Sequence, residues 1–286
     1  MICTWYARNA ARAAAIILIA LSVCGFGGVE SLFAPKAALW ENWTAHESGS
    51  AKSVDHSGWD RFLATHVTSH QDGVNRISYG SVDATGNKNL DEYIARLTSV
   101  SVQSLSRPEQ LAYWINLYNA LTVKVVLSHY PVASIRDIDI SPGLFSDGPW
   151  DKKLVSVGGE PVNLNDIEHR ILRPIWRDPR IHYALNCASI GCPNLQKKAF
   201  TAANAERMLE DAARAYINDP RGVRVEDDSL VVSSIYAWFT DDFGGGVAGV
   251  LAHLRKYADS ELKSKLDTEG ELEDAYDWTL NDASPN

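Results

Sequence analysis

Apolar residues recur at helical spacing in the longest amphipathic segment of the chain, residues 106–130. Intervals of three and four residues between apolar positions are typical of one face of an α-helix. The positions concerned are Leu111, Trp114, Ile115, Tyr118, Leu121, Thr122 and Val125. Ser106 and Glu109 have the spacing of an N-terminal capping box, and Pro131 should end the helix after Tyr130. The pattern therefore predicts one long helix with a broad apolar face.

Shorter patterns predict more helices and a series of strands. We expect helices at residues 57–67, 89–100, 166–172, 202–217, 246–257 and 260–266. We expect strands at residues 76–82, 152–157, 161–164, 181–186, 221–225, 230–232 and 276–280. Helices outnumber strands, and the strands come mostly in hairpins rather than in alternating βαβ units. This predicts an α+β fold in which helices pack on a small, mostly antiparallel sheet.

The start of the chain differs in kind from the remainder. Arg8 and Arg12 precede an uncharged run, residues 13–29, which contains AAAIILIAL. Two cations before an apolar stretch are typical of a secretory signal peptide. The run is short for a spanning helix, which needs roughly 20 apolar residues, but a tilted anchor stays open. We therefore expect residues 1–29 to be a signal peptide or an N-terminal membrane anchor.

The remaining residues, 30–286, show no internal repeat and no low-complexity linker, so we expect a single α+β domain. With such a leader, the protein should be exported, either periplasmic or anchored to the outer face of the inner membrane. The formal net charge of the whole chain is −9. That acidity argues against nucleic acid as a partner and suits a small-molecule or peptide ligand.

The cysteines limit the chemistry that the folded part can carry. Cys3 and Cys24 lie in the leader, which leaves Cys187 and Cys192 for the folded part. In an oxidising compartment these two could form a disulfide across the turn at residues 188–191, if the turn brings their Cα atoms within about 7 Å. Alternatively, Cys187 could be a thiolate nucleophile at the end of a strand, residues 181–186, where a following turn exposes it.

A thiolate nucleophile needs a base or a positive environment. His182 is the nearest histidine in sequence, but an extended strand would separate it from Cys187 by roughly 16 Å. His169, on the short helix before this strand, is an equally good partner through the fold. The candidates to orient the imidazole, as the third group of a triad does, are Glu168, Asn116 and Asn119.

Structural roles compete with these catalytic ones. Glu168 has the spacing to complete a capping box with Asn165, in a short helix that Pro174 should end. His182 can be a hydrogen-bonded core residue, and the two asparagines can bond neighbouring loops. For substrate binding, the candidates are the Asn186 side chain or turn amides as an oxyanion site, with Trp238 and Asp241 at a pocket wall. Aromatic residues at this spacing, Tyr276 and Trp278 included, are also typical of a core.

Several motifs resemble domain-of-unknown-function family 547. They are AYWINLYNALT at 112–122, NLNDIEHRILR at 163–173, RIHYALNCASIGCP at 180–193, SSIYAWFTDDFG at 233–244 and YDWTLN at 276–281. The resemblance covers roughly Leu39 to Asn281 and implies little about activity. Some members are distantly similar to papain- and transglutaminase-like cysteine hydrolases, which implies a possible papain-like fold. Those enzymes have their cysteine at the start of the first long helix, whereas the long helix here has none.

Three functions are compatible with these residues. The first is a cysteine-dependent hydrolase or acyltransferase acting on amide substrates, such as a peptide or a cell-wall fragment. The second is a non-catalytic periplasmic binding or structural module with a Cys187–Cys192 disulfide. The third is a zinc-binding protein, since Cys187, Cys192, His182, His169 and Glu168 are all competent ligands, although the spacing matches no recognised zinc motif. The sequence indicates no cofactor.

Overall fold

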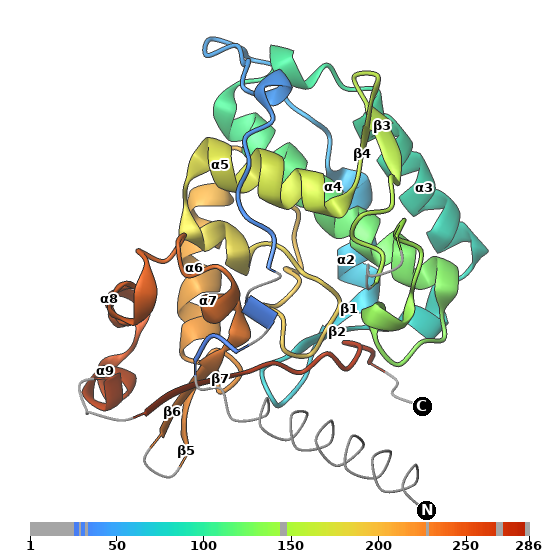
Figure 1. Ribbon diagram of the computed structural model, residues 1–286. Coiled ribbons are helices and arrows are strands. Elements are labelled where there is room, and N and C mark those ends of the chain that lie inside the picture. Colours follow the sequence, from blue (N-terminus) through green and yellow to red (C-terminus); the bar gives the residue numbers. More distant parts are fainter. Residues whose placement is uncertain are drawn as a thin grey trace, which may run out of the picture.

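The computed structural model describes residues 26–28, 30–31, 34–143, 148–226, 229–266 and 271–283 (Figure 1). The leader predicted at residues 1–29 lies almost wholly outside these ranges, so it stays a prediction. In the part of the chain that is described, no helix combines the length and the apolar character that a membrane crossing requires.

The fold is built around one long helix, α4 (Arg107–His129), as the apolar pattern predicted. Buried residues lie on every face of α4, so neighbours surround it rather than covering one stripe. Helix α3 (Ala84–Thr98) packs beside it, and α2 (Ser57–His66) packs against α3. The other helices are α5 (Arg173–Trp176), α6 (Ala205–Ile217), α7 (Ser234–Trp238), α8 (Gly246–Tyr257) and α9 (Ser260–Leu266).

Within the described residues, the strands form three small sheets rather than one. Two are hairpins, β1 (Val67–Ser69) with β2 (Asn75–Ile77), and β3 (Val155–Val157) with β4 (Glu160–Val162). The third joins β5 (Val223–Glu226), β6 (Ser229–Ser233) and β7 (Glu271–Ala275), with β7 parallel to β6. The other pairings are antiparallel, and the α+β prediction is confirmed. The prediction of a single domain over residues 30–286 is not tested.

The strand predicted at residues 181–186 is wrong. Residues Pro179–Tyr183 form a 3₁₀-helix, followed by an irregular loop. Asp178 caps this turn by accepting a hydrogen bond from the Arg180 N–H at 2.9 Å, and Pro179 is compatible with a first helical turn. A short apolar run can be buried equally well as a strand or as a 3₁₀-turn, so the Asp178 cap and Pro179 decide the conformation of this segment.

Two further elements differ from prediction. The last strand, β7, ends at Ala275, and residues Thr279 and Leu280 make only isolated bridges, to Ser134 and Ser189. The segment predicted as a strand at 76–82 divides into β2 and a 3₁₀-turn, Tyr79–Ser81.

The two predicted capping boxes do not form. No side-chain cap is made by Ser106, and Glu109 instead accepts a hydrogen bond from the Val54 N–H at 2.7 Å. Asn165 makes none either, and the helix after it is a π-helix, η6 (Asp166–Leu172), that continues into α5 through Pro174. Asn163 and Asp166 cap this turn reciprocally instead. Glu168 is thereby free of any capping role.

Residues 184–192, called here the cysteine loop, are held from the α4 side by one amide side chain. Asn119, 2% exposed, donates from Nδ2 to the Ala184 carbonyl at 2.9 Å and accepts from the Asn186 N–H at 2.9 Å. Asn116 makes the same two kinds of hydrogen bond to Phe200: it donates to the Phe200 carbonyl and accepts from the Phe200 N–H. Each asparagine therefore replaces a backbone partner that an irregular segment would otherwise lack.

The segment after β7 holds the cysteine loop from the other side. Ile190 and Gly191 donate their N–H groups to the carbonyls of Thr279 and Asp277, each at 2.8 Å. Gly191 is required at this contact, because an added Cβ would lie 2.7 Å from the Asp277 nitrogen. This approach brings the Tyr276 side chain to the loop.

Residues 34–40 form a strap over η6 and α5 (Figure 1). Ala38 and Trp40 donate their N–H groups to the carbonyls of His169 and Arg170, each at 2.9 Å. These carbonyls belong to the π-helix, so the strap occupies acceptors on its outer side. The Pro35 carbonyl in turn accepts from Arg173 at 2.8 Å.

The amide clamp on the cysteine loop gives a stability prediction. We expect Asn119→Ala to lower the free energy of unfolding by about 2–4 kcal/mol, because it leaves a buried carbonyl and a buried N–H without partners. Asn89→Ala, an exposed position of α3, is the matched control and should change the free energy by less than about 0.5 kcal/mol. Urea unfolding of both variants measures the difference, and equal values would show that the clamp contributes nothing.

Candidate functional site

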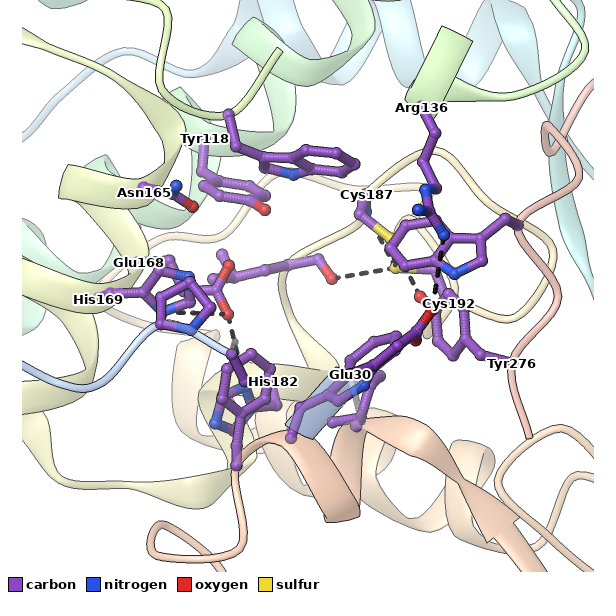
Figure 2. A pocket seen from close by; sticks show the side chains of 18 of the residues that line it. Glu30, Tyr118, Arg136, Asn165, Glu168, His169, His182, Cys187, Cys192 and Tyr276 are labelled. Carbon is purple, nitrogen blue, oxygen red and sulfur yellow. Dashed lines mark hydrogen bonds and ion pairs between the residues drawn. The ribbon is translucent and has the colours of Figure 1, made fainter. Parts of the chain in front are cut away.

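A pocket of about 430 Å³ lies between η6, the cysteine loop, α7 and the segment after β7. Figure 2 shows two walls: Glu168, His169 and His182 lie on one side, and Cys187, Cys192 and Tyr276 lie on the other. The remaining lining residues are Glu30, Ala34, Pro35, Tyr118, Arg136, Trp150, Asp151, Asn165, Leu185, Ile235, Trp238, Phe239 and Trp278.

Cys187 is a free, half-buried thiol on the pocket wall. Its Sγ lies 3.0 Å from the Cys192 Sγ, 3.0 Å from the Tyr276 hydroxyl and 3.3 Å from the Ser189 hydroxyl. Cys192 is also a free thiol but is 3% exposed, and its sulfur accepts the Cys187 N–H at 2.9 Å. The disulfide that the sequence left open is therefore not formed in this structure.

The surroundings of the two sulfurs shift the pKa values of the two thiols in opposite directions. The hydrogen bond from Cys192 lowers the pKa of Cys187, and those from Ser189 and Tyr276 add to it, against the opposing effect of burial. Burial raises the pKa of Cys192, and the neighbouring Cys187 raises it further. A low thiol pKa and access to solvent mark a reactive cysteine, whereas a buried thiol with a raised pKa stays protonated. Cys187 is thus the reactive member of the pair.

The polar groups of the loop around Cys187 already have hydrogen-bond partners within the protein. The Asn186 side chain donates to the Pro193 carbonyl at 2.8 Å and accepts from Ala188 and Asn281. It does not line the pocket, so the structure gives no support for Asn186 as an oxyanion donor. The amides of Cys187, Ala188, Ile190 and Gly191 are also occupied. Ala188 has φ 63°, a left-handed conformation that costs a non-glycine residue free energy and that clusters at functional sites.

The opposite wall is built on a histidine between two carboxylates. His182 Nε2 lies 2.7 Å from Asp242 Oδ2, and its Nδ1 lies 3.5 Å from Glu168 Oε1. Burial by itself would lower the pKa of His182, but the hydrogen bonds to Asp242 and Glu168 raise it. With a carboxylate at each nitrogen, the imidazolium is the favoured form. Both ring nitrogens of His182 therefore face carboxylates rather than the Cys187 thiol.

Arg173 completes this cluster. Its Nε lies 2.5 Å from Asp242 Oδ2, and its Nη1 donates to His169 Nδ1 at 2.9 Å. An arginine can only donate, so His169 Nδ1 accepts and the neutral ring has its proton on Nε2. Burial lowers the pKa of His169 to about 4, which is consistent with a neutral ring. The charges of Glu168, Asp242, Arg173 and protonated His182 then sum to zero, which makes their burial tolerable.

Glu168 is the part of this cluster that faces the pocket. Burial would raise its pKa, but His169, His182 and Arg173 lower it to about 2, so the carboxylate stays ionised at neutral pH. Glu168 also lies near Tyr118, a second pocket residue, and its negative charge adds to burial, the main cause, in raising the pKa of the Tyr118 hydroxyl. The pocket thus pairs a thiol on one wall with a fixed carboxylate on the other.

Aromatic rings form the remaining surface around the sulfur. Trp238 stacks on Trp278 with 5.6 Å between ring centroids, and Tyr276 lies 4.8 Å from Trp278 and 4.9 Å from Trp238. Arg136 lies over Trp278 and 3.7 Å from Glu30. Trp238, a candidate for a pocket wall, lines the pocket, and so do Tyr276 and Trp278, which were expected to be core residues; together they give the pocket an apolar side.

The structure brings together most, but not all, of the predicted site residues. Cys187, Cys192, His182, His169, Glu168 and Trp238 line the pocket. Asn116, Asn119 and Asn186 do not line it and bond backbone or neighbouring side chains. Asp241 is exposed, and its neighbour Asp242 makes the contacts expected of a site residue.

Three residues that matter here were not predicted as site residues: Tyr276, Ser189 and Arg173. Tyr276 in particular is the neighbour of the Cys187 sulfur, where a histidine was expected, and both pocket histidines contact charged groups instead. No local signal in the sequence pairs Tyr276 with a cysteine 89 residues away. As to metals, the described part of the chain holds no group of three or more His, Cys, Asp or Glu side chains that could bind an ion.

The fold and the pocket together describe an α+β protein with a cysteine-centred pocket. Residues 102–217 match a family model described as "Protein of unknown function, DUF547", which confirms the predicted resemblance. The match is shorter than expected, and it includes the cysteine loop, η6 and α4 but not α7 or Tyr276. Comparison with curated proteins finds no match, and neither does comparison with solved structures.

The cluster around His182 gives a prediction about pH. Since the folded-state pKa of His182 is raised above 6.5, the imidazolium adds stability that is complete below pH 6.5 and is lost as the pH rises through the folded value. We expect Asp242→Asn to lower the His182 pKa, whereas Asp241→Asn, the exposed neighbour, should leave it unchanged. NMR titration of the histidine ring protons, with His182→Asn to assign the signal, measures this. Equal shifts in both aspartate variants would contradict the clamp.

Proposed function

We propose that the pocket is the active site of a thiol-dependent hydrolase or acyltransferase, with Cys187 as the nucleophile toward an amide carbonyl. One observation carries the proposal: a solvent-accessible sulfur with three hydrogen-bonding neighbours, Cys192, Tyr276 and Ser189, in a pocket that also holds an ionised carboxylate. These neighbours favour the thiolate, which is the reactive form of cysteine. The exported location expected from the leader is part of the same proposal.

In the first step, the Cys187 thiolate attacks the carbonyl carbon and forms a carbon–sulfur bond. The carbon–nitrogen bond breaks, and the nitrogen leaves as an amine after taking a proton from solvent in the open pocket. In the second step, water attacks the thioester, which releases a carboxylic acid and restores the Cys187 thiol. An amine in place of water would give acyl transfer instead of hydrolysis.

Tyr276 is the proposed oxyanion donor. Its hydroxyl is 3.0 Å from the sulfur, and burial is the first of the effects that raise its pKa, so it stays protonated at neutral pH. As the sulfur attacks, negative charge passes from sulfur to the carbonyl oxygen, and the hydroxyl can follow it over a short distance. Tyr276 thereby replaces Asn186, whose amide is already bound to Pro193.

Glu168 is the proposed positioning group on the facing wall. Its carboxylate is ionised and oriented by His182, so it can accept a hydrogen bond from the substrate N–H or orient the attacking water. His182 acts through Glu168, because both of its nitrogens already face carboxylates. This differs from a cysteine–histidine pair, in which the imidazole would take the thiol proton directly.

The nucleophile is tested on the full-length chain with Cys3 and Cys24 replaced by serine. An activated p-nitrophenyl ester of N-acetylphenylalanine should release about one equivalent of p-nitrophenol in a burst and add one acyl group at Cys187, as mass spectrometry can locate. Cys187→Ser should reduce the burst at least ~100-fold, because the hydroxyl lacks an adjacent base. The same burst in Cys187→Ser, or an acyl group on another residue, would disprove the assignment.

The role of Tyr276 has its own test in the same assay. Tyr276→Phe should slow acylation by roughly 10–1,000-fold, the range for loss of one oxyanion donor, and move the pH midpoint of iodoacetamide labelling of Cys187 upward. Tyr130→Phe, whose hydroxyl bonds Asp282 away from the pocket, is the matched control. If both variants acylate at the wild-type rate, Tyr276 is only a packing residue.

A further inference from the structure

We infer that Cys187 and Cys192 form a dithiol pair that reduces small disulfides by thiol–disulfide exchange. In this reaction Cys187 is the attacking thiol and Cys192 the resolving thiol. The inference rests on the proposed reactivity of Cys187 but adds a second activity and a second substrate class to the pocket: a low-molecular-weight or peptide disulfide.

The geometry of the two sulfurs is the first argument. They lie 3.0 Å apart as free thiols, whereas a disulfide bond is about 2.05 Å long. Closing the bond therefore needs a movement of about 1 Å, within the range of small side-chain rotations. The Cys187 N–H, which donates to the Cys192 sulfur at 2.9 Å, keeps the second sulfur facing the first.

Unequal access is the second argument. Both cysteines line the pocket, but Cys187 is half-buried, whereas Cys192 is 3% exposed and also approaches the Leu185 carbonyl at 3.6 Å. An incoming disulfide therefore meets Cys187 first, and the resulting mixed disulfide lies next to a thiol that solvent cannot readily reach. A reactive outer thiol with a covered inner partner is the arrangement that exchange through a mixed disulfide requires.

The turn between the two cysteines is the third argument. Ser189 pairs with Leu280, and Ile190 and Gly191 donate to Thr279 and Asp277, so the segment after β7 fixes the backbone of the turn. The loop does not have to refold to bring the sulfurs together or to separate them. The pair is consequently preorganised in its reduced form.

The reaction balances within the pair and its substrate. The Cys187 thiolate attacks one sulfur of the substrate, a mixed disulfide forms, and one substrate thiolate leaves. Cys192 then attacks the Cys187 sulfur, its proton passes to the departing thiolate, and the second substrate thiol is released. Two electrons have passed from the dithiol to the substrate disulfide, and the protein ends with a Cys187–Cys192 disulfide.

The experiment uses the full-length chain with Cys3 and Cys24 replaced by serine, and oxidised glutathione as the probe. After acid quenching and N-ethylmaleimide treatment, mass spectrometry should find a protein lighter by two hydrogens, with neither cysteine alkylated. Cys192→Ser should instead stop as a stable adduct with one glutathionyl group on Cys187. Cys187→Ser should react at least roughly tenfold more slowly, because its remaining thiol is buried.

Two results would overturn the inference. One is a wild-type pair that stops at the mixed disulfide, and the other is an equally fast reaction of Cys187→Ser at Cys192. Thermal unfolding checks that each variant is folded. The alkylation pattern of the oxidised wild-type protein tests the inference without any substitution of Cys187 or Cys192. The ester assay separates this inference from the proposed function, because acylation of Cys187 without glutathione exchange would disprove only the dithiol activity.

Discussion

The site depends on one constraint: the cysteine loop is held from two sides by hydrogen bonds to its backbone. Asn119 of α4 occupies a carbonyl and an N–H at the start of the loop, and the segment after β7 occupies two N–H groups near its end. An irregular buried segment cannot satisfy its own backbone groups, so these partners decide where Cys187 stands. The left-handed conformation of Ala188 persists because both sides of the loop are fixed.

A second constraint is electrostatic. Two half-buried carboxylates, Glu168 and Asp242, lie against the buried side chains of Arg173 and His182, and the four charges cancel only if His182 is protonated. This requirement takes His182 away from the thiol and leaves Glu168 as an ionised group facing the pocket. The site therefore has its charged cluster and the Cys187 thiol on separate walls, with the pocket between them.

Because the His182 cluster and Cys187 lie on opposite walls of the pocket, the neighbours of the Cys187 thiol differ from those in a cysteine–histidine pair. A tyrosine hydroxyl, a serine hydroxyl and a second thiol contact the Cys187 sulfur. These groups are suited to stabilising a thiolate, and the second thiol is also suited to forming a bond with it. The two proposed reactions, with an amide and with a disulfide, thus begin from the same Cys187 sulfur and differ only in the steps after its first attack.

Periodicity predicted the helices well, because α2, α3, α6, α8 and α9 each bury a face that recurs along the chain. The same spacing located α4, although α4 is buried on every face. The double glycine at 158–159 likewise determined the β3–β4 hairpin, since both residues have positive φ. Residue chemistry alone was sufficient to select Cys187, Cys192, His169, His182 and Glu168, because thiols, imidazoles and carboxylates close together in sequence are uncommon.

Tertiary structure alone decided how these groups are used. The run at 181–186 became a 3₁₀-turn and a loop, and the capping role expected of Glu168 passed to Asn163 and Asp166. The partner of Cys187 came from Tyr276, and Asp242, rather than the expected pocket residue Asp241, makes contacts in the site, where it pairs with His182. A sequence records which groups can donate, accept or ionise. Which two of them meet across 60 or 89 residues depends on how the chain closes its backbone hydrogen bonds and balances its buried charges.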